Sequence, residues 1–545
     1  MSNPNKKISK SLTPARQLAL RTLLSMQARG EKLQASLNET LGTAPKTVLP
    51  EDKALATELV YGCIRLKIRL DWILDQQFNK PDAVPLAMRR VMRMAVYELA
   101  YLSHIPSYAT LNSYVDAIKA GYGPKLAGLA NAVLRKISQV PLHDENWFKQ
   151  QLSGAAATAS PNAHTTASSA NSGDSPPNGN NFKEFMRIWY SLPAWLLNHF
   201  LTNYPADVAE QYLAASIATP PLGLRLNKRD EHFLNLSQTL PQEAGFILQQ
   251  DNALAFHSGF MPKNFGKMLA QGQMTRQSFA AQEIMQQVFS CLANEVKSAL
   301  ELGPIWDVCA GQGGKTCWML ENGLPVAASV DTSLQRLHGL AREAKRLHLT
   351  LKTDEIDETA ETNEIGHAGQ ADETGHAGQA GENLKAREAL ANEGIDEIGQ
   401  VKKQEEGAGV STCSALTIAL AIVAADASKP LPLKGHQPGI ILVDAPCSGL
   451  GTLSRRPDIK IYREPSDLPA LAALQKKIIT TNFARLPSGG LLIYLTCTLN
   501  PAENQEVVAH LQQNNKNAQQ IFTWCTPPNS ISKEFFWVSV IKKTN

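Results

Sequence analysis

The sequence predicts a multidomain fold, with an all-α N-terminal domain followed by an α/β domain built on a mostly parallel, doubly wound sheet. A chain of 545 residues is long enough for more than one domain. Between residues 14 and 138, apolar residues recur at three- and four-residue steps and no alternating strand pattern interrupts them. From about residue 304, short apolar segments alternate with helical ones, which is typical of βαβ units and parallel sheets.

Residues 1–151 are expected to form the helical domain, and their charge indicates a polyanionic partner. They carry 21 Lys and Arg residues against 12 Asp and Glu residues. Basic residues gather on two of the expected helices, at Arg65, Lys67, Arg69, Arg89, Arg90 and Arg93. Such a cluster indicates either an RNA-binding face or an ordinary solvated helix surface.

Two polar segments divide the rest of the chain. Residues 152–182 include AAATASPNAHTTASSANSGDSPPNGNN, which predicts a flexible linker. Residues 354–412 are expected to be a disordered acidic insertion, since residues 354–407 hold 15 acidic and 4 basic residues. Between these segments, residues 183–300 are predicted to form a helical and α/β RNA-recognition segment, in which PPLGLRLNKRD (220–230) alternates Leu222, Leu224 and Leu226 like a half-buried strand.

Composition excludes several other classes of protein. The most apolar run, ALTIALAIVAA (415–425), is too short to span a bilayer, and the start MSNPNKKISK has no hydrophobic signal core. We therefore expect a cytoplasmic chain with no membrane partner. The eight cysteines form no C-x-x-C pair and have no His partners at zinc spacing, so we expect free thiols and no metal site.

The loop DVCAGQGGKT (307–316) is the first candidate binding site. It follows the predicted strand PIWDV, and Gly313 and Gly314 open the next helix. A phosphate-binding P-loop would need glycine where Cys309 stands. A dinucleotide-binding loop would need a third glycine where Thr316 stands. Both patterns therefore miss by one residue, and the neighbouring motifs have to decide.

Acidic residues follow the next predicted strands. Asp331 ends PVAASV about twenty residues beyond Gly311, where dinucleotide-binding folds place the acid that binds ribose hydroxyls. This spacing predicts a ligand that contains a ribose. Asp426 follows IALAIVAA and is either a second ligand contact or a simple turn cap, and Asp354 and Asp357 are alternatives for its role.

Two cysteines stand at the ends of the following two strands. GIILVDAPCSGLG (439–451) places Asp444 and Cys447 at the carboxyl end of the sheet, where such folds bind ligands. GGLLIYLTCTLNPAEN places Cys497 in the matching position one strand later. Asn500 and Glu503 are typical of a cap and its capping-box partner, so a helix should start behind Cys497 and lower the pKa of its thiol.

Together these motifs resemble those of the S-adenosylmethionine-dependent RNA cytosine-5 methyltransferases. The family motifs D-x-C-A-A-P-G-G-K-T, D-A-P-C-S-G and T-C-S correspond here to DVCAGQGGKT, DAPCSG (444–449) and TCT (496–498). RRPDIK (455–460) and the tail EFFWVSVIK are also similar to the family. DKALATELVYG and AGLANAVLR resemble the NusB-type RNA-binding domain of one branch, the small-subunit (16S) rRNA methyltransferase B group, which is also called Sun/Fmu-like.

The resemblance implies a NusB-like helical domain, a Rossmann-like class I methyltransferase domain at residues 301–545, and roles for the matched positions. The implied S-adenosylmethionine-binding residues are Cys309, Ala310, Gly311, Gln312, Gly313, Gly314, Lys315, Asp331, Asp426 and Asp444. Cys497 would be the nucleophile, Cys447 would assist product release, and Asp444 would contact the donor or the target base. The implied partner is small-subunit ribosomal RNA. We expect the protein to bind it as a monomer and to need no metal ion.

The sequence also departs from the family pattern. Gly311 and Gln312 replace the usual Ala-Pro, which removes a rigid turn, and Ile461 stands where the family has an aromatic residue. The changes at Gly311 and Gln312 leave a second hypothesis open, that of a non-catalytic RNA-binding or ribosome-assembly protein with a decayed donor loop. A P-loop ATPase fits less well, because this chain lacks the first glycine of that motif and an ATPase does not need the two cysteines.

Overall fold

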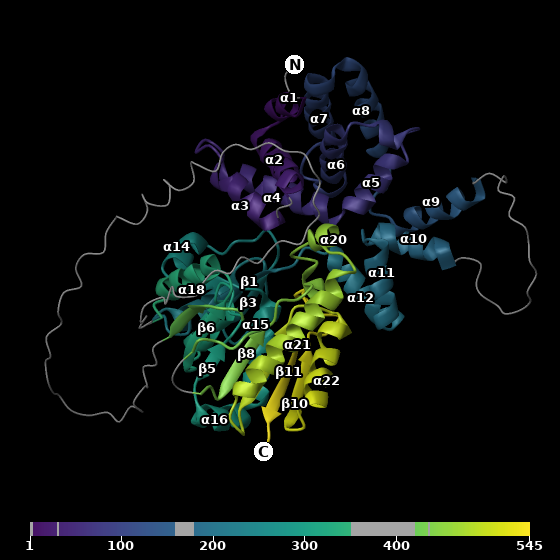
Figure 1. The fold of residues 1–545 in the computed structure, drawn as a ribbon. Coiled ribbons are helices and arrows are strands. Elements are labelled where there is room, and N and C mark those ends of the chain that lie inside the picture. Colours follow the sequence, from purple (N-terminus) through teal and green to yellow (C-terminus); the bar gives the residue numbers. More distant parts are fainter. Residues whose placement is uncertain (1–3, 30–31, 159–178, 350–419, 434–436) are drawn as a thin grey trace, which may run out of the picture. The chain divides into compact units, whose positions relative to one another are not determined.

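The computed structural model describes residues 4–29, 32–158, 179–349, 420–433 and 437–545. The predicted acidic insertion lies outside these residues, as do Asp354, Asp357 and most of the predicted linker. Helices reach into both ends of that predicted linker, because α9 ends at Thr158 and α10 begins at Gly179. The described residues form a helical region, a small antiparallel sheet and a larger sheet (Figure 1).

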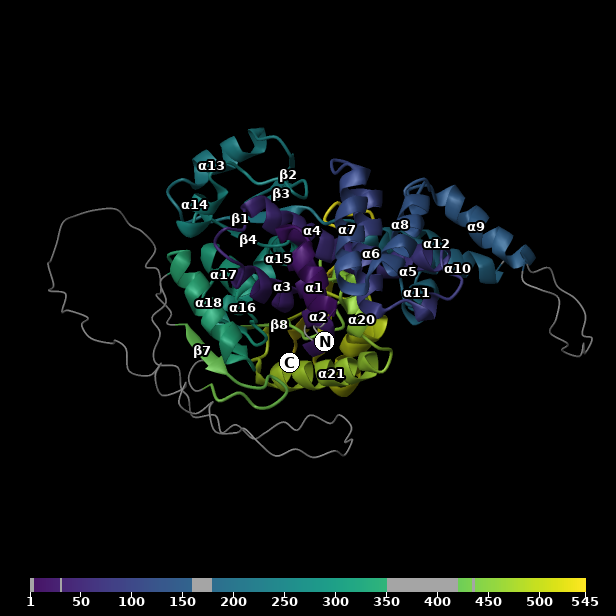
Figure 2. The ribbon, with the colours of Figure 1, turned by 90° about the horizontal axis from the view of Figure 1, so that it is seen from above.

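The N-terminal region is helical throughout, as predicted. Its helices are α1 Pro4–Ser11, α2 Pro14–Arg29, α3 Leu33–Gly42, α4 Pro50–Arg65, α5 Lys67–Asp75, α6 Leu86–Tyr101, α7 Ser107–Tyr122, α8 Pro124–Ile137 and α9 Glu145–Thr158, with a 3-10 turn η1 at Pro81–Ala83. Met88, Val91, Met92 and Ala95 of α6 recur at helical spacing and are fully buried. In Figure 2, α6 lies side by side with α7 and α8, consistent with their contacts in the structure.

The predicted basic face is only partly at the surface. Arg65, Arg69 and Arg93 are all buried, with at most 7% of each residue exposed. Arg65 donates to the carbonyl of Ser454, and Arg69 stacks on Trp189 with its guanidinium 4.0 Å from the ring centre. Arginines are rarely buried unless they are paired, and these three are paired within the protein. For these three of the six residues, both interpretations of the cluster, an RNA-binding face and a solvated helix surface, are therefore wrong.

The middle of the chain contains three helices and a small antiparallel sheet. The helices are α10 Gly179–Trp189, α11 Ala194–Asn203 and α12 Ala206–Ile217. The strands pair in the order β2-β3-β1-β4, and the elements of this part are β1 Leu222–Leu226, α13 Phe233–Thr239, η2 Leu240–Gln242, β2 Phe246–Gln250, β3 Ala253–Phe256, α14 Phe265–Ala270 and β4 Met274–Arg276.

Strand β1 is more buried than its alternating pattern predicts. Residues 223–226 are all buried, including Arg225, whose Nε lies 2.8 Å from Oε2 of Glu321. Arg225 also donates to the carbonyl of Gly314 at 2.8 Å. The polar position of the alternating pattern therefore holds the small sheet against the helix that follows the glycine loop.

The C-terminal region is a doubly wound sheet, as predicted. Its strands pair in the order β10-β11-β9-β8-β5-β6-β7, and all pairs are parallel except those of β11 with β9 and β10. The elements are α15 Phe279–Cys291, α16 Ala293–Leu302, β5 Ile305–Asp307, α17 Gly314–Glu321, β6 Val326–Asp331, α18 Leu334–Arg346, β7 Ala421–Ala424, β8 Ile440–Asp444, η3 Leu450–Thr452, α20 Ile459–Tyr462, α21 Asp467–Arg485, β9 Leu491–Thr496, η4 Pro501–Glu503, α22 Gln505–Asn514, β10 Ala518–Cys525 and β11 Trp537–Lys543.

Helices cover both faces of this sheet. Side chains alternate across a strand, so Ile440 and Leu442 of β8 pack in the core with α15 to α18. Ile441 and Val443 pack in the other core, with α21 and α22. The strand order reverses at β5, which lies between β6 and β8. In open α/β sheets, ligands bind at the carboxyl ends of the strands beside such a reversal.

Candidate active site

A cavity of about 560 Å³ lies at this reversal point. It is lined by residues that follow five strands of the larger sheet: Cys309 after β5, Asp331 at the end of β6, Asp426 after β7, Asp444 and Cys447 at and after β8, and Cys497 after β9. Every titratable residue predicted for the site therefore lines one cavity, except Lys315, which reaches it through Asp444.

The glycine loop is fixed to the next strand by its backbone. Gly311 has φ +57° and its N–H donates to Oδ2 of Asp331 at 3.0 Å. Gly313 has φ +81°, and a Cβ there would lie 2.4 Å from Cγ of Leu340, so a side chain does not fit. Helix α17 begins at the next residue, Gly314, as predicted.

Not every residue of the predicted loop faces the cavity. Cys309 and Gly311 line it, whereas Ala310, Gln312, Gly313 and Gly314 are not among its lining residues. Gln312 is exposed, and its side chain lies beside Gly339 of α18. Position 312 therefore belongs to the outer side of the loop in this chain.

Two acids beside the loop have different roles. Nζ of Lys315 lies 2.5 Å from Oδ2 of Asp444, and this ion pair raises the pKa of Lys315 against the opposing effect of burial. Asp307 is buried beneath the loop and accepts from Thr316 at 2.7 Å, and its burial raises the pKa of its carboxyl to about 7. Sequence reasoning did not single out Asp307, because nothing in the motif separates it from a strand-tip acid.

Asp426 combines the two interpretations that the sequence left open. It lines the cavity, and its Oδ1 also accepts from the backbone N–H and the hydroxyl of Ser428, at 2.9 and 2.7 Å. The carboxylate therefore caps its own turn while it faces the cavity.

The two cysteines at the strand tips are in direct contact. Sγ of Cys447 lies 3.3 Å from Sγ of Cys497. The hydrogen bond with Cys447 lowers the pKa of Cys497, an effect that outweighs burial, and the positive charges of Arg456 and Lys315 add to it. The same contact, together with burial, raises the pKa of Cys447. Burial raises the pKa of Cys309, the third cysteine of the cavity, so Cys497 is the one that most readily ionises.

A buried carboxylate holds the two cysteine loops together. Glu503 is fully buried; its Oε2 accepts from the backbone N–H of Ser448 at 2.8 Å and from Gln475 at 2.9 Å. Its Oε1 accepts from the side chain of Asn500 at 3.0 Å. The interpretation of Glu503 as a capping-box partner is therefore wrong, because its oxygens accept from these three groups and not from the backbone N–H of Asn500. Asn500 does cap the turn η4, which precedes α22.

The segment RRPDIK connects the cavity to other parts of the described chain. Arg455 forms an ion pair with Glu534 of the EFFW tail at 2.7 Å, and Arg456 lines the cavity. Asp458 accepts from the backbone N–H of Leu33, and Lys460 is buried and donates to the carbonyl of Arg65 at 3.4 Å. Only Arg456 of these residues reaches the cavity.

Sequence reasoning missed most of a cationic rim around the cavity. Lys32, Arg336, Arg456 and Arg463 line it. Burial and the charges of the three arginines lower the pKa of Lys32. The doublet RR in RRPDIK was a visible signal for Arg456, but no motif marks Lys32 or Arg336, which join the cavity from the N-terminal region and from α18.

Two further features concern metals and membranes. Within the described ranges, no group of His, Cys, Asp and Glu side chains is arranged to hold a metal ion. None of the helices of these ranges has the length and hydropathy that a membrane crossing needs.

Comparisons with known proteins identify two families in the chain. Residues 13–139 match the NusB family, and residues 401–537 match the family described as 16S rRNA methyltransferase RsmB/F. The chain is 26% identical to the probable ribosomal RNA small subunit methyltransferase B of Synechocystis sp., over 94% of this chain and 92% of that protein. It is also 26% identical to the ribosomal RNA small subunit methyltransferase B of Erwinia tasmaniensis, over 94% and 93%.

A solved structure supports the fold. The crystal structure of PH0851 is 15% identical and matches with a TM-score of 0.59, covering 98% of this chain and 99% of that one. The predicted helical and doubly wound α/β architecture is thereby confirmed. The chain combines a NusB family domain with a methyltransferase domain of the 16S rRNA methyltransferase RsmB/F family.

Proposed function

We propose that this chain transfers a methyl group from S-adenosylmethionine to carbon 5 of a cytosine in small-subunit (16S) ribosomal RNA, through a bond between Cys497 and carbon 6 of that cytosine. The observation that carries the proposal is the contact of Cys447 and Cys497, 3.3 Å apart in a cavity that Asp331, Asp426 and Asp444 also line. The RsmB/F match and the names of the similar proteins support the substrate class.

The residues on one side of the cavity fit the methyl donor. Asp331 ends β6 with a carboxylate that lines the cavity, where folds of this class bind ribose hydroxyls. Gly311 and Cys309 of the glycine loop and Asp426 complete this side. S-adenosylmethionine bound there would supply an electrophilic methyl group.

The cysteines would provide the nucleophile and assist its release. Carbon 5 of cytosine is a poor nucleophile, but addition of the Cys497 thiolate to carbon 6 converts the ring to an enamine that can take a methyl group at carbon 5. The proton on carbon 5 then leaves, the carbon-sulfur bond breaks, and the ring regains its double bond as the thiolate returns to Cys497. The lowered pKa of Cys497 suits the first step, and Cys447 stands where it can assist the last.

The target cytosine has to be unstacked from its neighbours. Carbon 6 of a base in a duplex is covered by the stack, so a thiol reaches it only when the base is extruded or single-stranded. The cationic rim of Lys32, Arg336, Arg456 and Arg463 would attract the phosphates on either side of such a base.

Two cysteine variants test the proposal with the full-length chain, S-adenosylmethionine and small-subunit ribosomal RNA. Cys497→Ala should transfer no methyl group and form no covalent complex. Cys447→Ala should attack carbon 6 and stall, leaving protein bound to RNA through a carbon-sulfur bond that survives a denaturing gel as a retarded band. Cys291→Ala, which changes an exposed cysteine of α15, is the matched control and should behave as the unchanged protein.

Each other outcome has a defined meaning. A retarded band with Cys497→Ala but not with Cys447→Ala would exchange the two roles. A band with neither would contradict covalent catalysis. If the unchanged protein binds RNA but shows neither S-adenosylmethionine binding in a titration nor methyl transfer, the chain is the non-catalytic RNA-binding protein that the altered loop at Gly311 left open. Where methyl transfer does occur, bisulfite sequencing of the RNA identifies the methylated cytosine.

A further inference from the structure

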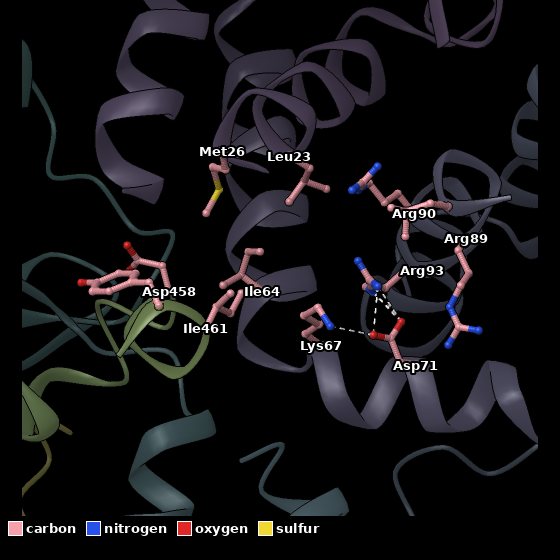
Figure 3. A pocket seen from close by; sticks show the side chains of 12 residues that line it. Leu23, Met26, Ile64, Lys67, Asp71, Arg89, Arg90, Arg93, Asp458 and Ile461 are labelled. Carbon is pink, nitrogen blue, oxygen red and sulfur yellow. Dashed lines mark hydrogen bonds and ion pairs between the residues drawn. The ribbon is translucent and has the colours of Figure 1, made fainter. Parts of the chain in front are cut away.

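A second cavity of about 560 Å³ lies beside the catalytic one and has no role in the chemistry above (Figure 3). Helices α2, α4, α5 and α6 contribute most of its lining, and the short helix α20 of the methyltransferase domain and the residue before it, Asp458, contribute the rest. Its volume lies in the range of ordinary ligand sites.

The cavity contains one guanidinium with no ionic partner. Lys67 and Arg93 both pair with Asp71, at 3.0 and 2.6 Å, and Figure 3 shows these bonds as dashed lines that do not reach Arg90. Arg89 pairs with Asp75 at 2.6 Å. Among the residues that the structure describes, no carboxylate, carbonyl or hydroxyl forms a hydrogen bond or an ion pair with Arg90.

The surroundings of Arg90 favour an anion from outside the chain. Burial lowers the pKa of Arg90, the neighbouring charge of Arg93 lowers it further, and Tyr122 opposes both effects without forming a hydrogen bond to Arg90. Arg90 is partly exposed and a guanidinium stays charged in proteins despite such shifts, so water offsets part of its desolvation and an anionic ligand would offset the rest. Asp458, another acid of this cavity, already accepts from the backbone N–H of Leu33.

The rest of the lining is apolar and partly open to solvent. It includes Leu23, Met26 and Ile64, together with Leu86 and Ile461, which are 54% and 48% exposed. An apolar surface next to an unpaired cation suits a ligand with a flat, uncharged body and an attached anionic group. A nucleotide has this chemistry, because its base is flat and its phosphate is charged.

One helical turn separates this cavity from the catalytic one. Ile461 and Tyr462 of α20 line the second cavity, while Arg456 and Arg463, on either side of α20, line the first. Arg456 also donates to the hydroxyl of Tyr462 at 3.2 Å. α20 has four residues, so it spans about 6 Å at 1.5 Å per residue. An RNA strand with its target base in the first cavity therefore has a second binding surface within a short reach.

We infer that this second cavity binds one unpaired nucleotide that flanks the target cytosine, with its phosphate at Arg90 and its base against the apolar wall and Tyr462. Unpaired bases are commonly bound on aromatic and apolar side chains in this way. The inference rests on the proposed function for its RNA substrate. It adds a site that fixes which neighbour of the target the protein recognises.

The test measures RNA binding as a function of salt concentration with full-length variants. Arg90→Ala removes one phosphate contact, so it should weaken binding by about 3- to 10-fold and lower the salt slope by about 0.7 to 1, whereas Arg90→Lys should keep the slope. Arg135→Ala, which changes an exposed arginine of α8, is its control.

Leu86→Asp places a carboxylate in the cavity at the first turn of α6, where helices tolerate acids, and should also weaken binding. Leu49→Asp, at the exposed start of α4, is its control.

Parallel methyl-transfer measurements separate this inference from the proposed function. If the unchanged protein methylates the RNA, and both Arg90→Ala and Leu86→Asp bind as it does, the second cavity is no nucleotide site and the inference is overturned. If the unchanged protein binds RNA without methylating it, and both variants weaken binding, the site stands while the proposed function fails. If the two control variants weaken RNA binding as much as Arg90→Ala and Leu86→Asp do, the effect comes from the change in net charge and not from the second cavity. That result would also overturn the inference.

Discussion

The two sides of the catalytic cavity are built in different ways. On the donor side, Asp331 and Asp426 present carboxylates to the cavity and bond mainly to the backbone of their own or the adjacent loop. On the cysteine side, Glu503 is buried and joins the loops of Cys447 and Cys497 through several hydrogen bonds. The donor side has to bind and release a small ligand, so its carboxylates remain available as hydrogen-bond acceptors. The cysteine side has to form a covalent bond, so its reacting atoms are held in position before the substrate binds.

The largest effect is expected from the cysteine side, with Glu503→Ala. Its removal leaves the N–H of Ser448 and the side-chain amide of Asn500 buried without an acceptor, and each such group typically costs about 1 to 3 kcal/mol. Gln475 loses one of its two acceptors and keeps the carbonyl of Pro446. We expect methyl transfer to fall by about 100-fold or more, because the cysteine loops lose their alignment. Affinity for the donor, measured by calorimetric titration, should change by less than about 2-fold. An equal loss of donor affinity would show that the two sides are not independent.

A smaller effect is expected from the donor side, with Asp331→Ala. Hydrogen bonds to a charged group are typically worth about 1.5 to 3 kcal/mol, so donor affinity should fall by about 10- to 100-fold. The covalent band of the Cys447→Ala variant should still form when Asp331→Ala is added, since attack on carbon 6 uses the other side. A double variant that forms no band would place Asp331 in the chemistry of the base.

Site residues that local sequence patterns mark could be predicted, whereas contacts between residues far apart in the sequence could not. The strand tips at Asp331, Cys447 and Cys497 were predictable, because an apolar strand followed by a polar turn is a local pattern. The role of Glu503 was not, since a capping box and a buried bridge have the same sequence signature and only the position of the Ser448 loop separates them.

The prediction for the basic cluster of the N-terminal region was partly wrong for a related reason. Arg65, Arg69 and Arg93 look the same in sequence as Arg90, but their partners Ser454, Trp189 and Asp71 lie on other elements, and burial against those elements decides their role. Lys32 was missed because no nearby motif marks it, although it lines the catalytic cavity.

The pH dependence of stability provides a third test, on the donor side. Burial raises the pKa of Asp307 to about 7 from the ordinary value of 3.8. The folded protein therefore holds a proton that the unfolded chain releases, so this group's contribution to stability is lost as pH rises from about 4 to 7. Asp307→Asn has no such titration and still accepts a hydrogen bond from Thr316. Its thermal midpoint should rise relative to the unchanged protein between pH 5 and pH 7.5, and a constant difference would contradict the raised pKa.

The last test compares two glycines of the donor loop, and it depends on the smallest difference between variants. A Cβ at Gly313 meets Cγ of Leu340 at 2.4 Å in addition to the strain of φ +81°, so Gly313→Ala should destabilise the protein by about 2 to 4 kcal/mol, as strain and overpacking together predict. At Gly311, φ is +57° and no atom lies within 4 Å of the added Cβ, so Gly311→Ala should cost only about 1 to 2 kcal/mol. Urea titrations of both variants at one pH measure the difference.

Donor affinity should fall less for Gly311→Ala, because the loop keeps its shape and its bond to Asp331 uses the backbone N–H, which alanine retains. A larger loss at position 311 than at 313 would mean that the donor approaches closely where a Cβ now stands, and would place Gly311 against the ligand.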